Sequence, residues 1–239
     1  MNNKIKKILK KKNKSKIVCL TAYSKNIAEI IDDHADIVLV GDSLGSVLYN
    51  YDTTRKVSLN MMIEHTKSAR MGVKKSLLVI DLPYNTYRSK SEALKNSKKA
   101  IKETKCDAVK VEGGTKVKEI VKHLVKNRIP VLGHIGITPQ TTKGKFISKG
   151  KNEAEKRKLF KDAKDLEQSG AFGIVLQCIY SAGSKRITNL INIPTIGIGA
   201  SVNCDGQVLV TDDLIGLNET KFRFVKKFGN IKKNIKSAV

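Results

Sequence analysis

Three acidic residues, Asp42, Asp81 and Glu112, lie where short runs of Val, Ile and Leu end. Successive acids are separated by roughly the length of one β-strand and the helix that follows it. Because parallel strands end at the same edge of a sheet, we expect the three side chains to form one site. Three carboxylate ligands would suit a hard cation such as Mg²⁺. Each acid alone could instead cap the following helix, but its recurrence at three strand ends favours a shared site.

Three further polar residues occupy similar positions. Lys110 lies two residues before Glu112, so both side chains point to the same side of one strand. Beside a metal, Lys110 would neutralise a substrate carboxylate or an enolate oxygen; otherwise the two residues would form a surface ion pair. His134, between small residues in 133–136, is either catalytic or a structural hydrogen-bonding residue. Gln177 ends another apolar run, where its amide could orient a ligand but has no useful basicity.

The elements that must position these residues alternate between strands and helices. We expect strands at 17–23, 36–41, 77–81, 108–112, 130–136, 173–178, 194–199 and 207–210, and helices at about 25–33, 60–72, 91–104, 115–127, 153–169, 181–190 and 219–237. This rhythm predicts a (β/α)₈ barrel, with the active site at the carboxyl ends of the strands. A doubly wound open sheet is the alternative, but its usual glycine-rich turn is missing from 20–24. The long connections 43–60 and 137–152 are expected to be binding loops.

The composition fits one domain in a reducing compartment. Of the 239 residues, 40% are hydrophobic, and we expect a barrel at 17–239 behind a basic N-terminal extension at 1–16. The lysine density of residues 1–14 predicts that they are poorly packed. No apolar run reaches the roughly 20 residues of a membrane span, and no secretory signal is seen. The four cysteines are widely spaced, which disfavours disulfides and zinc. We therefore expect a cytoplasmic protein.

The net charge of +24 raises the question of a nucleic-acid partner. Only seven of the 46 basic residues are arginine, the residue that nucleic-acid surfaces favour for its planar, stacking side chain. The lysines are spread along the chain, which indicates a general bias. Nucleic acid is therefore disfavoured, although the field would favour anionic substrates.

Several segments, in order along roughly 17–230, resemble the ketopantoate hydroxymethyltransferase family. They are Leu-Thr-Ala-Tyr at 20–23, Val-Gly-Asp-Ser-Leu-Gly at 40–45, Tyr-Asp-Thr-Thr at 51–54, His-Thr-Lys at 65–67, Asp-Leu-Pro at 81–83, Val-Lys-Val-Glu-Gly-Gly at 109–114, Gly-His-Ile-Gly-Ile-Thr-Pro-Gln at 133–140, Ile-Pro-Thr-Ile-Gly-Ile-Gly-Ala at 193–200 and Cys-Asp-Gly-Gln-Val-Leu-Val at 204–210. Together these motifs are highly specific.

The resemblance implies a barrel of the phosphoenolpyruvate/pyruvate type, usually a decamer, that transfers a one-carbon unit from 5,10-methylenetetrahydrofolate to 3-methyl-2-oxobutanoate. It implies that Mg²⁺ is held by Asp42, Asp81 and Glu112. It further implies that the 2-oxo acid contacts Asp42, Ser43, Asp81 and Lys110, with His134 beside it.

The chain also departs from the family pattern. Gln177 stands where the family has its general base, a Glu in a Leu-Glu-Cys context. Ser24 replaces a usual Asp, Ser201 replaces a usual Gly, and the sequence stops at Val239, short of the family's usual C-terminal segment. A catalytically impaired homologue that binds a 2-oxo acid is therefore one alternative. The other is a related superfamily lyase or aldolase, which would keep the acids but change the two long loops.

Overall fold

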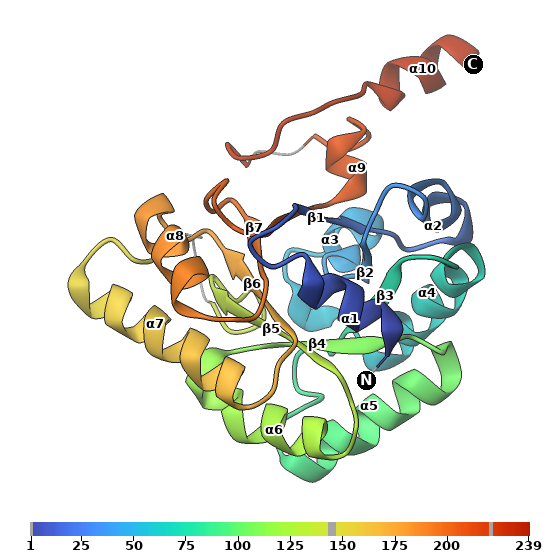
Figure 1. Cartoon of the computed structure of the whole chain (residues 1–239). Helices are drawn as coiled ribbons and strands as arrows, with labels where there is room; N and C mark the ends of the chain where they lie inside the picture. The colour runs from blue at the N-terminus through green and yellow to red at the C-terminus, as the bar shows by residue number, and fades with distance from the viewer. Residues whose placement is uncertain (1, 143–146, 220–221) are drawn as a thin grey trace.

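A computed structural model describes residues 2–142, 147–219 and 222–239, and it shows a closed barrel of eight parallel strands (Figure 1). Neighbouring strands pair in chain order, and β8 closes on β1. The strands are β1 Ile17–Thr21, β2 Ile37–Val40, β3 Leu77–Asp81, β4 Ala108–Glu112, β5 Val131–Gly136, β6 Gly173–Gln177, β7 Thr195–Ile198 and β8 Gly206–Leu209. All eight expected strands are confirmed, and closure excludes the open sheet.

Helices surround this barrel. They are α1 Asn3–Lys10, α2 Lys25–Ile31, α3 Leu44–Tyr49, α4 Leu59–Gly72, α5 Lys90–Thr104, α6 Gly114–Lys126, α7 Glu153–Gln168, α8 Ser181–Leu190, α9 Thr211–Leu214 and α10 Ile231–Ala238, with a 3₁₀ turn, η1, at Thr54–Lys56. Six expected helices match α2 and α4–α8. The expected helix at 219–237 is confirmed only in its last part, where α10 begins at Ile231. Residues 222–230 are not helical, and residues 220–221 lie outside the described residues. Figure 1 shows α10 projecting away from the barrel.

The barrel interior is a packed apolar core. Side chains alternate along each strand, and those pointing inward form one cluster, which includes Ile17, Cys19, Ile37, Leu39, Leu77, Val79, Ala108, Leu132, Val175, Ile196 and Val208. A second, larger cluster lies between the strands and the helices. Inward-facing positions continue to the strand ends, where the sequence changes from apolar residues to Asp81, Lys110 and Glu112. The alternation that builds the core therefore also aims these polar side chains inward.

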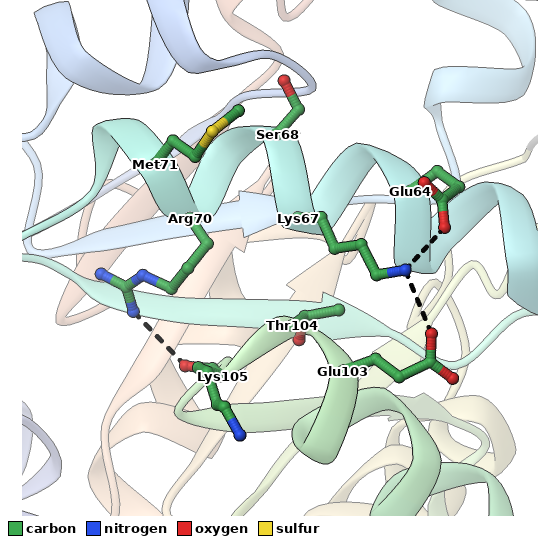
Figure 2. A pocket seen from close by; sticks show the side chains of 8 residues that line it. All are labelled: Glu64, Lys67, Ser68, Arg70, Met71, Glu103, Thr104 and Lys105. Atoms are coloured by element: carbon green, nitrogen blue, oxygen red, sulfur yellow. Dashed lines mark hydrogen bonds and ion pairs between the residues drawn. The ribbon is translucent and has the colours of Figure 1, made fainter.

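The outer wall carries a shallow hollow between α4 and α5 (Figure 2). Lys67 on α4 lies 2.8 Å from Glu64 and 3.2 Å from Glu103 on α5, so the two helices are joined by an ion-paired cluster. None of the residues that line this hollow belongs to the strand ends described above. It is a feature of helix packing on the barrel's outside.

The N-terminal segment packs against the barrel. The prediction that residues 1–14 are poorly packed was therefore wrong. Ile5 and Ile8 on α1 are 1% and 3% exposed and belong to the same cluster as the barrel interior. Residues spaced by three and four, with Leu9 beside them, form one apolar face of a helix. Lysine density concealed this face, because lysines can keep their ammonium groups in water while a helix buries its other side.

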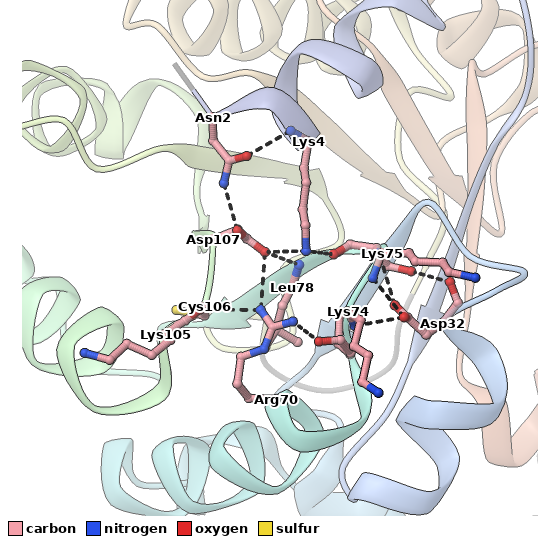
Figure 3. Close-up of polar contacts among 12 residues, drawn as sticks. Asn2, Lys4, Asp32, Arg70, Lys74, Lys75, Leu78, Lys105, Cys106 and Asp107 are labelled. Carbon is pink, nitrogen blue, oxygen red and sulfur yellow. Dashed lines mark hydrogen bonds and ion pairs between the residues drawn. The ribbon is translucent and has the colours of Figure 1, made fainter.

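Polar contacts fix α1 in place (Figure 3). The Asn2 side chain caps α1 and donates a hydrogen bond to Asp107, 2.7 Å away. Lys4 donates to the carbonyl of Ser76 at 2.7 Å. Beyond the helix, Lys12 lies 2.9 Å from the buried carboxylate of Asp205, just before β8. The segment is therefore tied to several strands at the end of the barrel opposite the acidic residues.

Within the described residues, no helix combines the length and the apolar character needed to cross a membrane.

Candidate active site

Strand register places the polar residues of the barrel mouth side by side. Asp81 on β3 is opposite Lys110 on β4, and Glu112 is opposite His134 on β5. These four side chains are at most 5% exposed. Two carboxylates, an ammonium and an imidazole thus share one buried layer, directly above the apolar interior.

Asp81 and Lys110 form a buried ion pair, with 2.8 Å between Asp81 Oδ1 and Lys110 Nζ. The contact has ion-pair distance but lacks hydrogen-bond geometry, since Asp81 Oδ1 has no hydrogen-bond partner among the described residues. The other carboxylate oxygen, Oδ2, accepts from the backbone N–H of Asp42 at 3.1 Å. Removing one partner of such a pair would leave an uncompensated buried charge.

Asp42 reaches the mouth from the turn after β2. Glycine at position 41 leaves room for two neighbouring side chains of the mouth: a Cβ there would come within 2.9 Å of Ser43 Oγ and 3.5 Å of Asp81 Oδ2. The Asp42 carboxylate is 5% exposed and accepts a 2.8 Å hydrogen bond from the side-chain amide of Gln140. All three expected acids therefore lie at the barrel mouth, as their strand-end positions predicted.

Glu112 ends β4, and the chain turns away at once through Gly113 and Gly114, whose φ angles are 133° and 47°. Only glycine adopts such angles readily, so this pair allows the helix α6 to begin immediately behind the acid. Glu112 Oε1 lies 3.2 Å from His134 Nδ1. Neither nitrogen of His134 has a hydrogen-bond partner among the described residues, although the ring is 2% exposed. Because Nδ1 faces Glu112, Nε2 is the nitrogen that is suited to meeting a ligand.

The acids perturb one another. Burial, followed by the nearby charges of Asp81 and Glu112, raises the pKa of Asp42 well above its ordinary value. Burial alone would raise the pKa of Glu112 too, but His134 and Lys110 hold that pKa below its ordinary value. Burial opposes the charge of Lys110, yet the three carboxylates keep its pKa raised. Three acids crowded around one lysine in a buried site therefore favour the protonated form of Asp42.

Sequence reasoning missed Gln140, which lies in the long loop after β5 and is 1% exposed. Its backbone N–H donates to Glu112 Oε2 at 3.1 Å, while its side chain donates to Asp42. The motif at 133–140 ended on this residue, but loop residues carry no periodicity that would place them. The only sequence signal for Gln140 was that an amide lies near the start of a long loop, and long loops often bind ligands.

The remaining expected residues lie around this cluster. Ser43 is half-buried, and its hydroxyl is 2.8 Å from the hydroxyl of Tyr23. Gln177 ends β6, opposite Gly136 on β5, and is half-buried. The chain turns sharply after it, because Cys178 has a φ of 49°, a left-handed conformation that is uncommon outside glycine.

The residues of the mouth suit a divalent cation by their chemistry. Carboxylate oxygens are the ligands that hard cations prefer. A cation would offset the charges of Asp81 and Glu112, which after burial are what raises the pKa of Asp42. Within residues 2–142, 147–219 and 222–239, however, no three His, Cys, Asp or Glu side chains are gathered as a preformed metal centre. The carboxylates are instead held by Lys110, His134 and Gln140.

Similar proteins were found for nearly the whole chain. The family model described as ketopantoate hydroxymethyltransferase matches residues 2–239. The 3-methyl-2-oxobutanoate hydroxymethyltransferase of Pelagibacter ubique (strain HTCC1062) is 63% identical over 238 residues, covering 100% of this chain and 92% of the relative. The protein of the same name from Rhizobium etli is 48% identical over 227 residues, covering 93% and 83%.

Solved structures show the same fold at low identity. A 2,3-dimethylmalate lyase, described as a member of the PEP mutase/isocitrate lyase superfamily, matches with a TM-score of 0.66 and 10% identity, covering 100% of this chain and 82% of that one. A phosphonopyruvate hydrolase matches with a TM-score of 0.64 and 10% identity, covering 99% and 84%. The barrel thus has the same fold as these two enzymes. The family model over residues 2–239 and the relatives from Pelagibacter ubique and Rhizobium etli show that the chain belongs to the ketopantoate hydroxymethyltransferase family and is a one-carbon transferase.

Proposed function

We propose that this enzyme transfers a hydroxymethyl group from 5,10-methylenetetrahydrofolate to 3-methyl-2-oxobutanoate, giving 2-dehydropantoate for pantothenate synthesis, and that it requires Mg²⁺. The observation that carries the proposal is the buried layer at the barrel mouth, where Asp42, Asp81 and Glu112 surround Lys110. The family match over residues 2–239 favours this transferase over a related lyase.

We assign each residue a role that its position supports. Asp42, Asp81 and Glu112 would hold the cation, which supplies polarisation of the ketone and stabilisation of the enolate when bound. Lys110 keeps its charge in this site and would oppose the negative charge of the 2-oxo acid. Ser43, with its hydroxyl at the edge of the cluster, would complete the substrate contacts.

The reaction needs a base for the proton on C3 of 3-methyl-2-oxobutanoate. Loss of this proton gives an enolate, whose carbon forms a bond to the methylene carbon of the folate. Both bonds from that carbon to the folate nitrogens break, water supplies the hydroxyl oxygen, and the two nitrogens take up the C3 proton and one proton of the water. The amide of Gln177 cannot accept the proton at neutral pH. We assign that task to Nε2 of His134, which has no hydrogen-bond partner among the described residues, while Nδ1 lies beside Glu112. We expect slower turnover than with a carboxylate at position 177.

A product assay tests the proposal. The purified chain is incubated with 3-methyl-2-oxobutanoate and 5,10-methylenetetrahydrofolate, with Mg²⁺ or with a chelator, and 2-dehydropantoate is measured by mass spectrometry. We expect product with Mg²⁺ and none with the chelator. If no product forms although calorimetry detects binding of the 2-oxo acid, the chain is an impaired, ligand-binding homologue, the alternative that Gln177 favours.

Assembly and location are part of the same proposal. We expect a cytoplasmic homo-oligomer, a decamer by family resemblance, which light scattering would measure. Nucleic acid is not expected as a partner, and a DNA-binding assay at two salt concentrations checks this, because phosphate contacts give a steep dependence on salt.

A further inference from the structure

Gln140 is almost fully buried, and its donors hold two of the three acids of the barrel mouth. Its backbone N–H lies 3.1 Å from Glu112 Oε2. Its side-chain Nε2 donates to Asp42 Oδ2 at 2.8 Å and to the carbonyl of Leu82 at 3.0 Å, so both amide hydrogens are used. Gln140 therefore fixes one carboxylate oxygen of Asp42, which follows β2, and one carboxylate oxygen of Glu112, which ends β4.

The acceptors of Gln140 are also engaged. The hydroxyl of Tyr87 donates to Gln140 Oε1 and lies 3.4 Å from the backbone nitrogen of Glu112. Arg55, in η1, donates to the Gln140 carbonyl at 2.8 Å, and its guanidinium lies 5.1 Å from the centre of the Tyr84 ring. The amide can therefore occupy only one orientation, with its nitrogen toward Asp42.

We propose that Gln140 is a positioning residue of the cation site, which orients Asp42 and Glu112 through one oxygen each while their carboxylates serve the metal. This inference rests on the proposed Mg²⁺ dependence. Residues that orient metal ligands in this way contribute strongly to affinity, because a ligand free to rotate must be ordered when the metal binds. A mere anchor of the loop would affect folding but leave the affinity for the metal unchanged.

Calorimetric titration of the full chain with Mg²⁺ alone separates these roles. Gln140→Met keeps a side chain of similar length but removes the amide, so we expect Mg²⁺ to bind about 10–100-fold more weakly. The matched control is Thr141→Val, next along the chain, which removes a hydroxyl bonded to Thr138 within the same loop and touches neither acid. The control should bind Mg²⁺ within about twofold of the native chain, a change too small to reflect a lost ligand contact.

If the native chain binds Mg²⁺ and Gln140→Met binds it equally well, the positioning role is overturned while the proposed function stands. If the native chain does not bind Mg²⁺, both are overturned. Should Gln140→Met fail to fold, Tyr87→Phe carries the test, because it keeps Gln140 and removes only the hydroxyl that orients it. A several-fold loss of Mg²⁺ affinity in Tyr87→Phe supports the role, and unchanged affinity refutes it.

Discussion

The packing of α1 leads to a sharp prediction about stability. Ile5 is 1% exposed and contacts the cluster that fills the barrel. Truncation to alanine removes buried methyl groups and leaves a cavity, which typically costs about 2–5 kcal/mol. If the helix detaches instead, the cost is the free energy with which α1 docks, since eight residues do not form a stable helix alone.

Thermal unfolding followed by circular dichroism measures this cost. For a chain of this size, 1 kcal/mol corresponds to roughly 2–4 °C in melting temperature, so Ile5→Ala should lower it by about 4–20 °C. Lys7→Ala is the matched control, because Lys7 is exposed on the same helix; it should shift the melting temperature by no more than about 2 °C. Equal melting temperatures for Ile5→Ala, Lys7→Ala and the native chain would refute the docking of α1.

Three further predictions concern the acidic site and the opposite end of the barrel, where Lys12 contacts Asp205. Gln177→Glu should raise the rate of hydroxymethyl transfer about tenfold or more, because a placed general base contributes typically 10²–10⁴-fold; a variant no faster than the native chain would show that a carboxylate at position 177 is not placed to take the C3 proton. Asp81→Asn should weaken Mg²⁺ binding severely by calorimetry, and unchanged binding would remove Asp81 from the metal site. Burial opposes ionisation of Asp205, but the Thr195 N–H and Lys12 hold its pKa below the ordinary value, so its stabilisation is present above pH ~4 and is lost as pH falls through the folded pKa. Lys12→Met should therefore move acid unfolding to higher pH and cost about 1.5–3 kcal/mol near neutrality; an unchanged acid-unfolding midpoint would contradict this.

The barrel was predictable because its strands are buried on both faces and read as continuous apolar runs. The three acids were predictable because each ends such a run, and Lys110 because it shares a strand with Glu112. Register then places Asp81 beside Lys110 and Glu112 beside His134, without any information beyond the order of the strands.

The parts that were missed depend on contacts between distant segments. The apolar face of α1 consists of only Ile5 and Ile8 in a lysine-rich stretch. These two residues are buried because they pack against the end of the barrel, which the local sequence does not reveal. Gln140 lies in a loop, where its role depends on Asp42 and Glu112, far away in sequence. The expected helix at 219–237 was too long, because a composition that favours helix does not fix the residue at which the helix begins.

The most direct test of the account is the exchange of the C3 proton of 3-methyl-2-oxobutanoate in D₂O, followed by proton NMR without folate. Exchange isolates enolate formation, the step that we propose for the buried acids, Lys110 and His134. We predict that the native chain catalyses exchange with Mg²⁺, that a chelator abolishes it, and that Lys110→Met slows it. Exchange that continues undiminished in the chelator, or that is absent while the 2-oxo acid and Mg²⁺ both bind, would contradict the account.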